Sequence, residues 1–291
     1  MKQIIVPGKY VVAVSGGVDS VVLLDMLAQQ KNLELVVAHY DHGIRDNSAD
    51  DRTLTEALAH KYGFPFEYAE GNLGYGASEE LARSKRYEFL YAIRDKYGAK
   101  AIITAHHQDD VLETVIINLL RGTGRKGLSS LKSTDDLVRP LLDKTKQELI
   151  AYADEHKLKW NEDETNKDQA YLRNWVRINI IPKLTIEQRQ ELLARQKVAL
   201  ESNKTIDAML DTYISSVDPR TLNKRDITEL PHAVAVELIA HWLRANEIRE
   251  VDKKLLDRVT IGAKTLSPGK LIAIKGGVVV RVAARKLRLE K

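Results

Sequence analysis

Between residues 10 and 107, short apolar runs alternate with segments of helical pattern. The apolar runs are nearly continuous, which is typical of strands that are buried on both faces of a sheet. This alternation predicts an open parallel sheet of Rossmann-like α/β type, with right-handed crossovers and helices on both faces. The expected strands are Tyr10–Ser15, Leu33–Tyr40, Phe64–Glu70 and Lys100–His107, and the expected helices are Asp19–Gln30, Ser48–Tyr62, Ser78–Tyr97 and Asp109–Arg121.

A glycine-rich loop joins the first expected strand to the first expected helix, and its residues are Ser15, Gly16, Gly17, Val18, Asp19 and Ser20. The glycines permit a tight turn, and the helix N-terminus beyond them attracts anions. No Lys follows the glycines, so the loop is not a Walker A loop. A carboxylate at Asp19 would repel a phosphate unless a divalent cation lay between them, which favours Mg²⁺ there. A glycine turn that binds no ligand is the alternative.

Several chemically active segments follow expected strands. The loop at residues 15–20, the segment His39–His42 and the pair His106-His107 all stand at such positions. Ligands of open parallel sheets bind outside the carboxyl ends of the strands. We therefore expect these three segments to gather at one rim of the sheet.

The chain changes character after residue 182. We expect a catalytic domain at 1–182, a helical connection at 183–215 made of one long helix or a helix pair, and a small α+β domain at 216–291. The last part holds 16 Lys and Arg against 9 Asp and Glu, a net charge of +7, which favours docking of a polyanion. A basic surface without a partner is the alternative. Gly276-Gly277 between two apolar β-branched runs predicts a hairpin.

Composition restricts the remaining classes. No run approaches the roughly 18 apolar residues of a membrane helix, so we expect no membrane partner. The chain has no Cys, which excludes disulfides, thiolate metal sites and cysteine catalysis. The Pro7-Gly8 break does not fit a signal peptide, and the expected location is the cytoplasm.

Three further clusters stand in order along the chain, at His39–Arg45, Glu80–Tyr87 and Thr104–Thr114, the last running on to Gly124. Together with the glycine loop, Arg139–Leu142 and Arg173–Arg177, they make residues 10–182 resemble the tRNA(Ile)-lysidine synthases, enzymes of the PP-loop ATP-pyrophosphatase class. The C-terminal part resembles that family only in architecture. We expect a short form that stops where longer members continue into a further domain.

The resemblance implies a specific reaction. ATP would adenylate O2 of the wobble cytidine in the isoleucine tRNA that bears the anticodon CAU. The ε-amine of free L-lysine would then displace AMP from C2, giving lysidine, AMP and diphosphate. The implied co-substrate and ion are ATP and Mg²⁺, the partners are that tRNA and lysine, and a homodimer is left open.

The carboxylates of the third cluster suit the lysine. Asp110, Glu113 and Thr114 share one face of a helix that begins near Asp109. A carboxylate near the ε-amine can take its proton and make it a nucleophile. We therefore expect all three residues to bind lysine, with Asp19, Asp110 and Glu113 as the catalytic residues. Capping of the helix N-terminus is the alternative for these carboxylates.

Other polar residues complete the expected site. His39, Arg45, Arg83 and Arg86 are assigned with the glycine loop to ATP. The paired guanidiniums of Arg83 and Arg86 suit phosphate, with the tRNA backbone or a solvated helix face as the alternatives. His106 and His107 are expected near the nucleotide or the cytosine, with a zinc site as the alternative. The residues expected to contact tRNA are Arg121, Arg125, Lys126, Arg173 and Arg177.

Two other functions compete with this assignment. A tRNA thiolase resembles the N-terminal half but uses cysteines, and an amidotransferase-linked synthetase needs a glutaminase Cys. The absence of Cys counts against both. A tRNA-binding module without catalysis is the second rival, against which the intact glycine loop and carboxylates count.

Overall fold

A computed structural model describes residues 5–43, 48–71, 79–161, 171–248, 251–274 and 276–290. The chain divides into two compact units, Met1–Ala199 and Leu200–Lys291. The division falls inside helix α7 (Ile186–Ser215), which is one continuous helix. The three-part domain assignment made from the sequence stays a prediction.

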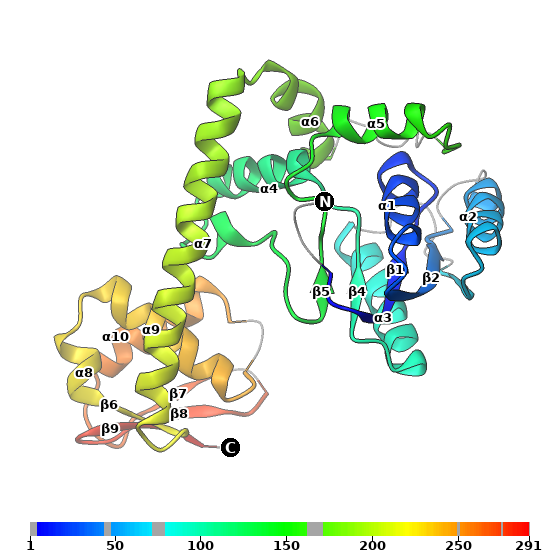
Figure 1. Cartoon of the computed structure of the whole chain (residues 1–291). Helices are drawn as coiled ribbons and strands as arrows, with labels where there is room; N and C mark the ends of the chain where they lie inside the picture. Colours follow the sequence, from blue (N-terminus) through cyan, green and yellow to red (C-terminus); the bar gives the residue numbers. More distant parts are fainter. Residues whose placement is uncertain are drawn as a thin grey trace. The chain divides into compact units, whose positions relative to one another are not determined.

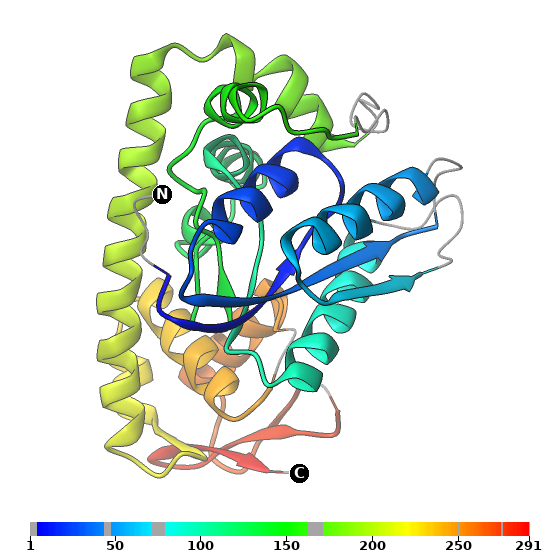
Figure 2. The same cartoon turned by 45° about the vertical axis from the view of Figure 1, so that its right-hand side comes forward.

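The first unit is built on a parallel sheet of five strands in the order β3-β2-β1-β4-β5 (Figures 1 and 2). The expected α/β fold is confirmed. The strands are β1 (Gly8–Ala13), β2 (Leu33–Asp41), β3 (Phe66–Glu70), β4 (Ala101–Ile103) and β5 (Leu137–Val138). The helices are α1 (Val18–Ala28), α2 (Ser48–Tyr62), α3 (Glu79–Tyr97), α4 (Gln108–Leu120), η1 (Gly127–Ser129), α5 (Lys146–Glu155), α6 (Leu172–Asn179) and η3 (Ile181–Lys183).

Successive residues of the central strand enter different cores. Val12 of β1 packs with α1, α2 and α5, whereas its neighbour Val11 packs with α3 on the opposite face. Both side chains are fully buried, and each such burial contributes about 1.5–3 kcal/mol. This two-sided burial is the physical reason for the continuous apolar runs in the sequence.

Strand β4 is shorter than the expected Lys100–His107. Regular pairing with β1 and β5 ends at Ile103, and His107 makes only an isolated parallel bridge to Leu141. Beyond the strand, the hydroxyl of Thr104 bonds Nδ1 of His106 at 2.9 Å. A polar turn thus replaces the end of the strand and leads directly into α4.

The sheet has a topological switch point between β1 and β4. The chain moves outward from β1 through β2 to β3, and then returns to the other side of β1 as β4. The glycine loop follows β1, and the N-terminus of α4 follows β4. Ligands of such sheets bind at this point, so the fold brings the expected loop and carboxylate helix to one rim.

The second unit combines the end of α7 with three helices and an antiparallel sheet in the order β6-β9-β8-β7. Its core surrounds the fully buried Trp242. The expected hairpin joins β7 to β8, whereas β6 and β9 were not identified from the sequence. The elements are β6 (Thr221–Asn223), α8 (Lys224–Glu229), α9 (His232–Ala245), α10 (Lys253–Thr265), β7 (Leu271–Ala273), β8 (Val279–Val282) and β9 (Lys286–Glu290).

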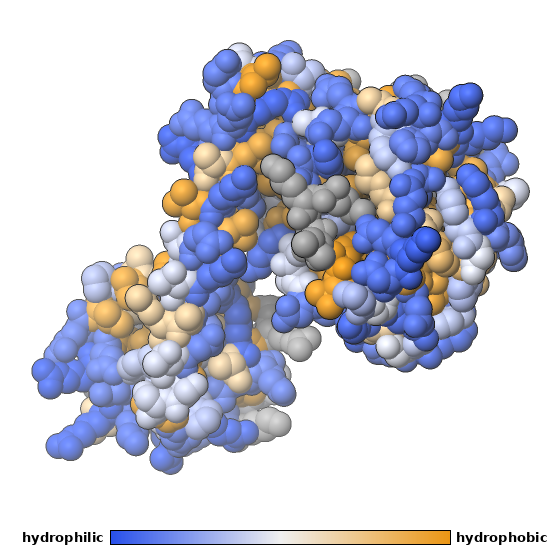
Figure 3. All heavy atoms as spheres, in the orientation of Figure 1, coloured by the Kyte–Doolittle hydropathy of each residue, from blue (hydrophilic) through white to orange (hydrophobic). Residues whose placement is uncertain are grey.

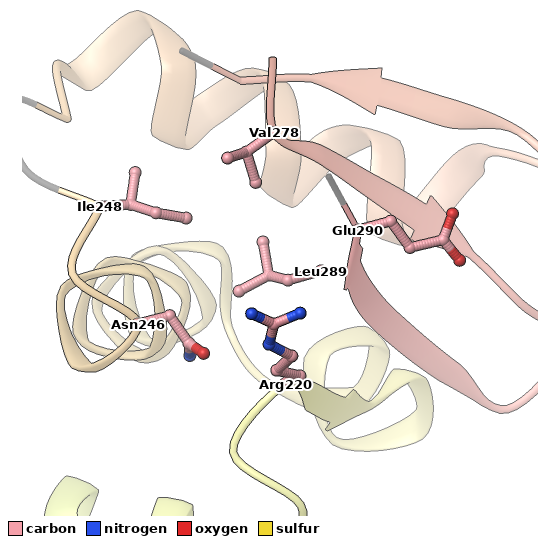
Figure 4. Close-up of a pocket in the computed structure, with 6 residues that line it drawn as sticks. All are labelled: Arg220, Asn246, Ile248, Val278, Leu289 and Glu290. Atoms are coloured by element: carbon pink, nitrogen blue, oxygen red, sulfur yellow. The ribbon is translucent and has the colours of Figure 1, made fainter. Parts of the chain in front are cut away.

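The surface of the second unit is largely polar on the face seen in Figure 3, with apolar residues scattered among hydrophilic ones. A small pocket in this unit, drawn in Figure 4, contains none of the expected site residues. Arg220, Asn246, Ile248, Val278, Leu289 and Glu290 line it. Within the described ranges, no helix has the length and apolarity needed to cross a bilayer.

Candidate active site

The glycine loop requires glycine at position 16, its second residue. Gly16 has φ +89°, and a Cβ on it would lie 2.8 Å from Oδ1 of Asp51 on α2. The carbonyl of Gly16 accepts a bond from the N–H of Asn161 at 3.0 Å. Asn161 also donates from Nδ2 to Oδ1 of Asp51 at 2.8 Å. Two neighbours therefore hold the loop close, and a side chain at Gly16 would displace them.

Ser20 braces the loop from within. Its hydroxyl donates to the carbonyl of Gly17 at 2.9 Å and accepts from the N–H of Ser15 at 3.1 Å. Gly17 is the N-cap of α1 and has no side chain to cap it, while Val18 begins the helix. The first N–H groups of α1 have no intrahelical partner, so they suit an anion at this end.

Asp19 is paired with a cation that the sequence analysis missed. Nζ of Lys146, the first residue of α5, lies 2.7 Å from Oδ1 and 2.9 Å from Oδ2 of Asp19. The only signal in the sequence was a Lys at the start of the helical pattern that runs through residues 144–156, where the helix dipole disfavours a cation.

His107 connects the glycine loop with α4. It is the N-cap of α4, and its Nδ1 accepts the N–H of Asp109 at 3.2 Å. In the neutral ring Nε2 must then carry the proton. Nε2 lies 3.6 Å from Oδ2 of Asp19 and 3.5 Å from Oδ2 of Asp110, so this N–H faces both carboxylates.

Asp110 has two functions in the fold. Its Oδ2 accepts a hydrogen bond from the N–H of His107 at 2.9 Å, so it caps α4. Capping was the alternative given for this carboxylate in the sequence analysis. Its Oδ1 lies 3.5 Å from a guanidinium nitrogen of Arg177. Burial would raise the pKa of Asp110, but the neighbouring His107, the hydrogen bond from its backbone N–H and the charge of Arg177 hold that pKa below its usual value.

Glu113 is a buried carboxylate held by two arginines. Its side chain is 1% exposed, and Arg177 of α6 donates to it from Nε at 2.7 Å and from a terminal nitrogen at 2.9 Å. Nε of Arg173 lies 3.3 Å away, and another nitrogen of Arg173 donates to Thr114 at 3.1 Å. Residues expected to bind lysine and residues expected to bind tRNA thus form one ionic cluster. Burial raises the pKa of Glu113, and Arg177 opposes that rise.

A second group of arginines stands beside this cluster. The guanidiniums of Arg83 and Arg86 lie 5.0 and 5.5 Å from the centre of the Tyr87 ring. Burial lowers the pKa of Arg86, and repulsion from Arg83 and Arg173 lowers it further. Burial likewise lowers the pKa of Arg139, which follows β5. Within the described part of the chain, no carboxylate pairs with Arg83, Arg86 or Arg139. Guanidiniums without internal counter-charge suit a polyanion.

His106 is neutral in this setting. Burial lowers its pKa to about 3, an effect opposed by Asp110 and reinforced by Arg139. Across the described ranges, no group of three or more His, Asp and Glu has the geometry of a metal site.

The other expected residues are more dispersed. His39 is 3% exposed, stacks on Tyr68, and bonds the carbonyl of Val14 through Nδ1 at 2.8 Å, which ties β2 to the end of β1. Arg121 is exposed at the end of α4, and Arg125 and Lys126 are half-buried in the loop that follows. Arg45 lies outside the described residues.

Three known proteins similar to this chain carry the same name. A tRNA(Ile)-lysidine synthase of Thermus thermophilus is 35% identical over 92% of this chain and 55% of its own length. One of Thermotoga sp. is 39% identical over 59% of this chain and 44% of its own length. One of Legionella pneumophila (strain Paris) is 32% identical over 86% of this chain and 61% of its own length.

The chain spans about half the length of the curated relatives it matches. The sequence profile of the PP-loop domain matches residues 2–184, which is most of the first unit and more than half of the chain. The glycine loop, the switch point and this match agree, and the chain belongs to the PP-loop domain family.

Proposed function

We propose that this chain ligates lysine to C2 of the wobble cytidine in the isoleucine tRNA with anticodon CAU, at the expense of ATP. The cytidine O2 attacks the α-phosphorus of ATP, and diphosphate leaves. The ε-amine of lysine then attacks C2, loses a proton, and AMP leaves. The curated relatives bear the name of this activity, and the site contains groups suited to each half of it.

The glycine loop and the arginines suit the nucleotide. The loop offers N–H groups at a helix N-terminus, and Arg83, Arg86 and Arg139 supply positive charge without internal carboxylate partners among the described residues. Asp19 fits Mg²⁺, because this ion is usually held by one or two carboxylates together with substrate phosphates. When bound, Mg²⁺ neutralises charge on the phosphates.

The observation that carries the proposal is a continuous series of charged and polar contacts from the loop to α6. It runs from Lys146 through Asp19, His107, Asp110 and Arg177 to Glu113, with each contact between 2.7 and 3.6 Å. Both half-reactions need a common cytosine. Groups suited to ATP and groups suited to an amine therefore belong within one site.

The two arginines give Glu113 a use in amine activation. Arg173 and Arg177 already balance its charge, so an ammonium that enters meets a positive environment. Such an environment lowers the pKa of the ammonium and favours the neutral amine, which is the nucleophile. The carboxylates of Glu113 and Asp110 can accept the released proton.

The tRNA would contact basic residues beyond this centre. Arg121, Arg125 and Lys126 follow α4, and the second unit carries the basic excess of the chain. Phosphate contacts of this kind predict binding that weakens steeply as salt rises.

Transfer of labelled lysine tests the proposal directly. The protein is given ATP, Mg²⁺ and isoleucine tRNA with CAU, and a transcript with U in place of the target C is the control. We expect label on the C-bearing tRNA alone, with AMP released, and loss of diphosphate release in Asp19→Asn. Diphosphate release without label would assign another nucleophile, and neither signal from a folded protein would favour a tRNA-binding module.

A further inference from the structure

The contact between Lys146 and Asp19 closes the glycine loop with a cation of the protein itself. Nζ of Lys146 lies within hydrogen-bonding distance of both carboxylate oxygens. The side chain of Lys146 is 36% exposed and that of Asp19 is 28% exposed, so solvent reaches the pair although it is partly buried. The two residues are 127 positions apart, and only the packing of α1 against α5 brings them together.

A second tie sets the separation of these two helices. Asp25 follows Asp19 by six residues on α1, and Tyr152 follows Lys146 by six residues on α5. The hydroxyl of Tyr152 donates to Asp25 at 2.7 Å. Because the two ties occur in the same order along both helices, α1 and α5 run in the same general direction, with their N-termini together. The Lys146–Asp19 pair therefore lies where two positive helix ends converge.

Lys146 occupies an unfavourable place in its helix. It is the first residue of α5, next to the cap Thr145, where the dipole disfavours a cation. Lys144, two residues earlier and just before the cap, pairs with Glu148 of α5 at 2.8 Å. Glu148 thus serves the cap and Lys144, whereas Lys146 has its partner on another helix.

Lys146 and a divalent cation compete for one carboxylate. Mg²⁺ binds carboxylate oxygens at short range, and an ammonium on both oxygens of Asp19 would be repelled by it. We propose that Lys146 is the displaceable internal counter-ion of Asp19: it holds the loop until Mg²⁺ with ATP takes the carboxylate. The released ammonium then stands beside the phosphates at the two converging helix ends. This inference rests on the ATP use included in the proposed function.

The competition predicts a change in the Mg²⁺ requirement. The probe is α,β-methylene-ATP, which cannot be cleaved between the α- and β-phosphates, and its binding is measured by calorimetry over a series of Mg²⁺ concentrations. For Lys146→Ala we expect the half-saturating Mg²⁺ concentration to fall about threefold to fivefold, as loss of a partly exposed ion pair allows. Lys146→Arg keeps the cation and should stay near the wild-type value.

Lys144→Ala is the matched control, since it removes a neighbouring lysine whose partner is Glu148 of α5 and not Asp19. Its Mg²⁺ requirement should not change. An unchanged or higher Mg²⁺ requirement in folded Lys146→Ala would overturn the inference. A purely structural Lys146 would lower the melting temperature and leave the Mg²⁺ requirement where it was. If Lys146→Ala does not fold, Lys146→Gln retains most of the side chain and is measured in the same way.

Lysine transfer by the same wild-type preparation separates the two proposals. If the Mg²⁺ requirement for probe binding shifts in Lys146→Ala but the wild type transfers no lysine, the counter-ion proposal stands and the lysidine reaction is rejected. If the wild type transfers lysine but the Mg²⁺ requirement does not shift, the lysidine reaction stands and the counter-ion proposal is rejected.

Discussion

Two buried carboxylates of the first unit, Asp25 and Glu113, are satisfied in opposite ways. Asp25 accepts bonds from three neutral donors, which are Tyr62 at 2.6 Å, Tyr152 at 2.7 Å and Gln29 at 3.0 Å. Glu113 instead accepts its hydrogen bonds from the guanidinium of Arg177 and forms an ion pair with that of Arg173.

The difference indicates that Asp25 has a structural role and Glu113 a catalytic one. Hydroxyls from α2 and α5 fix α1, and a passing cation gains little by displacing them. Arginines that are 27% and 36% exposed can instead share their carboxylate with an incoming ammonium. Asp25 should therefore matter for stability, and Glu113 for turnover.

The largest effect should come from Glu113→Gln. The variant keeps the size of the side chain but removes the proton acceptor, and lysine transfer should fall by about 100- to 10,000-fold. Diphosphate release should persist, because the glycine loop is untouched. Single-turnover transfer on purified tRNA measures the effect, and Glu148→Gln is an exposed control. Full transfer by a folded Glu113→Gln protein would show that Glu113 only holds α6.

Asp25→Asn should produce the opposite result. An amide cannot accept from both tyrosines as the carboxylate does, and the free energy of unfolding should fall by about 1–3 kcal/mol. Lysine transfer per folded molecule should stay close to wild type. Urea unfolding and the transfer assay on one preparation give both values. If Asp25→Asn lost lysine transfer while its free energy of unfolding stayed unchanged, Asp25 would have a catalytic role and would not differ from Glu113 in this respect.

The ionic centre should also respond to pH through His106. Its pKa in the folded chain is about 3, against 6.5 for the free group. Between these pH values the unfolded chain binds a proton at His106 and the folded chain does not. The stability of the folded chain therefore does not depend on His106 protonation above pH 6.5, and it falls progressively as the pH is lowered from 6.5 toward 3.

His106→Asn should therefore lose less stability than wild type on acidification. Urea midpoints at about pH 7.5 and about pH 5 measure the difference. His60→Asn on the exposed face of α2 is the control. Equal losses in wild type and His106→Asn would mean that His106 takes up its proton in the folded state.

The smallest effect should be that of Tyr152→Phe. Loss of the one hydrogen bond that the Tyr152 hydroxyl donates to Asp25 should lower the free energy of unfolding by about 0.5–1.5 kcal/mol. Burial raises the pKa of the Tyr152 hydroxyl to about 12, and the bond to Asp25 adds to that rise. An upward shift of the Tyr152 titration in Asp25→Asn, followed by tyrosinate absorbance, would contradict the assigned bond.

Much of the architecture followed from local patterns. The apolar runs predicted the parallel sheet because both faces of β1 are covered, and the limits of α2 agree with the expected helix. The short β4 was overestimated, since Thr104 is compatible with a strand until its hydroxyl engages His106. Strand β9 alternates buried Leu with exposed charged residues over a short span, a weak signal next to the glycine hairpin.

The pairing within the site could not be predicted from spacing. The face shared by Asp110, Glu113 and Thr114 follows from helix geometry, but no local rule brings Arg177 to Glu113 or Lys146 to Asp19. These pairs join residues 64 and 127 positions apart. The assignment of each site residue to ATP, lysine or tRNA stays a prediction.

The position of α6 has a consequence for synthesis on the ribosome. Glu113 is made well before Arg173 and Arg177, and burial of its charge without them would be costly. A nascent chain that ends before α6 should therefore keep α4 loosely docked, because closing the core would strand that carboxylate. Arrival of the two arginines completes the charge balance and lets the interior close. The ionic cluster should therefore delay the maturation of the first unit until α6 has emerged.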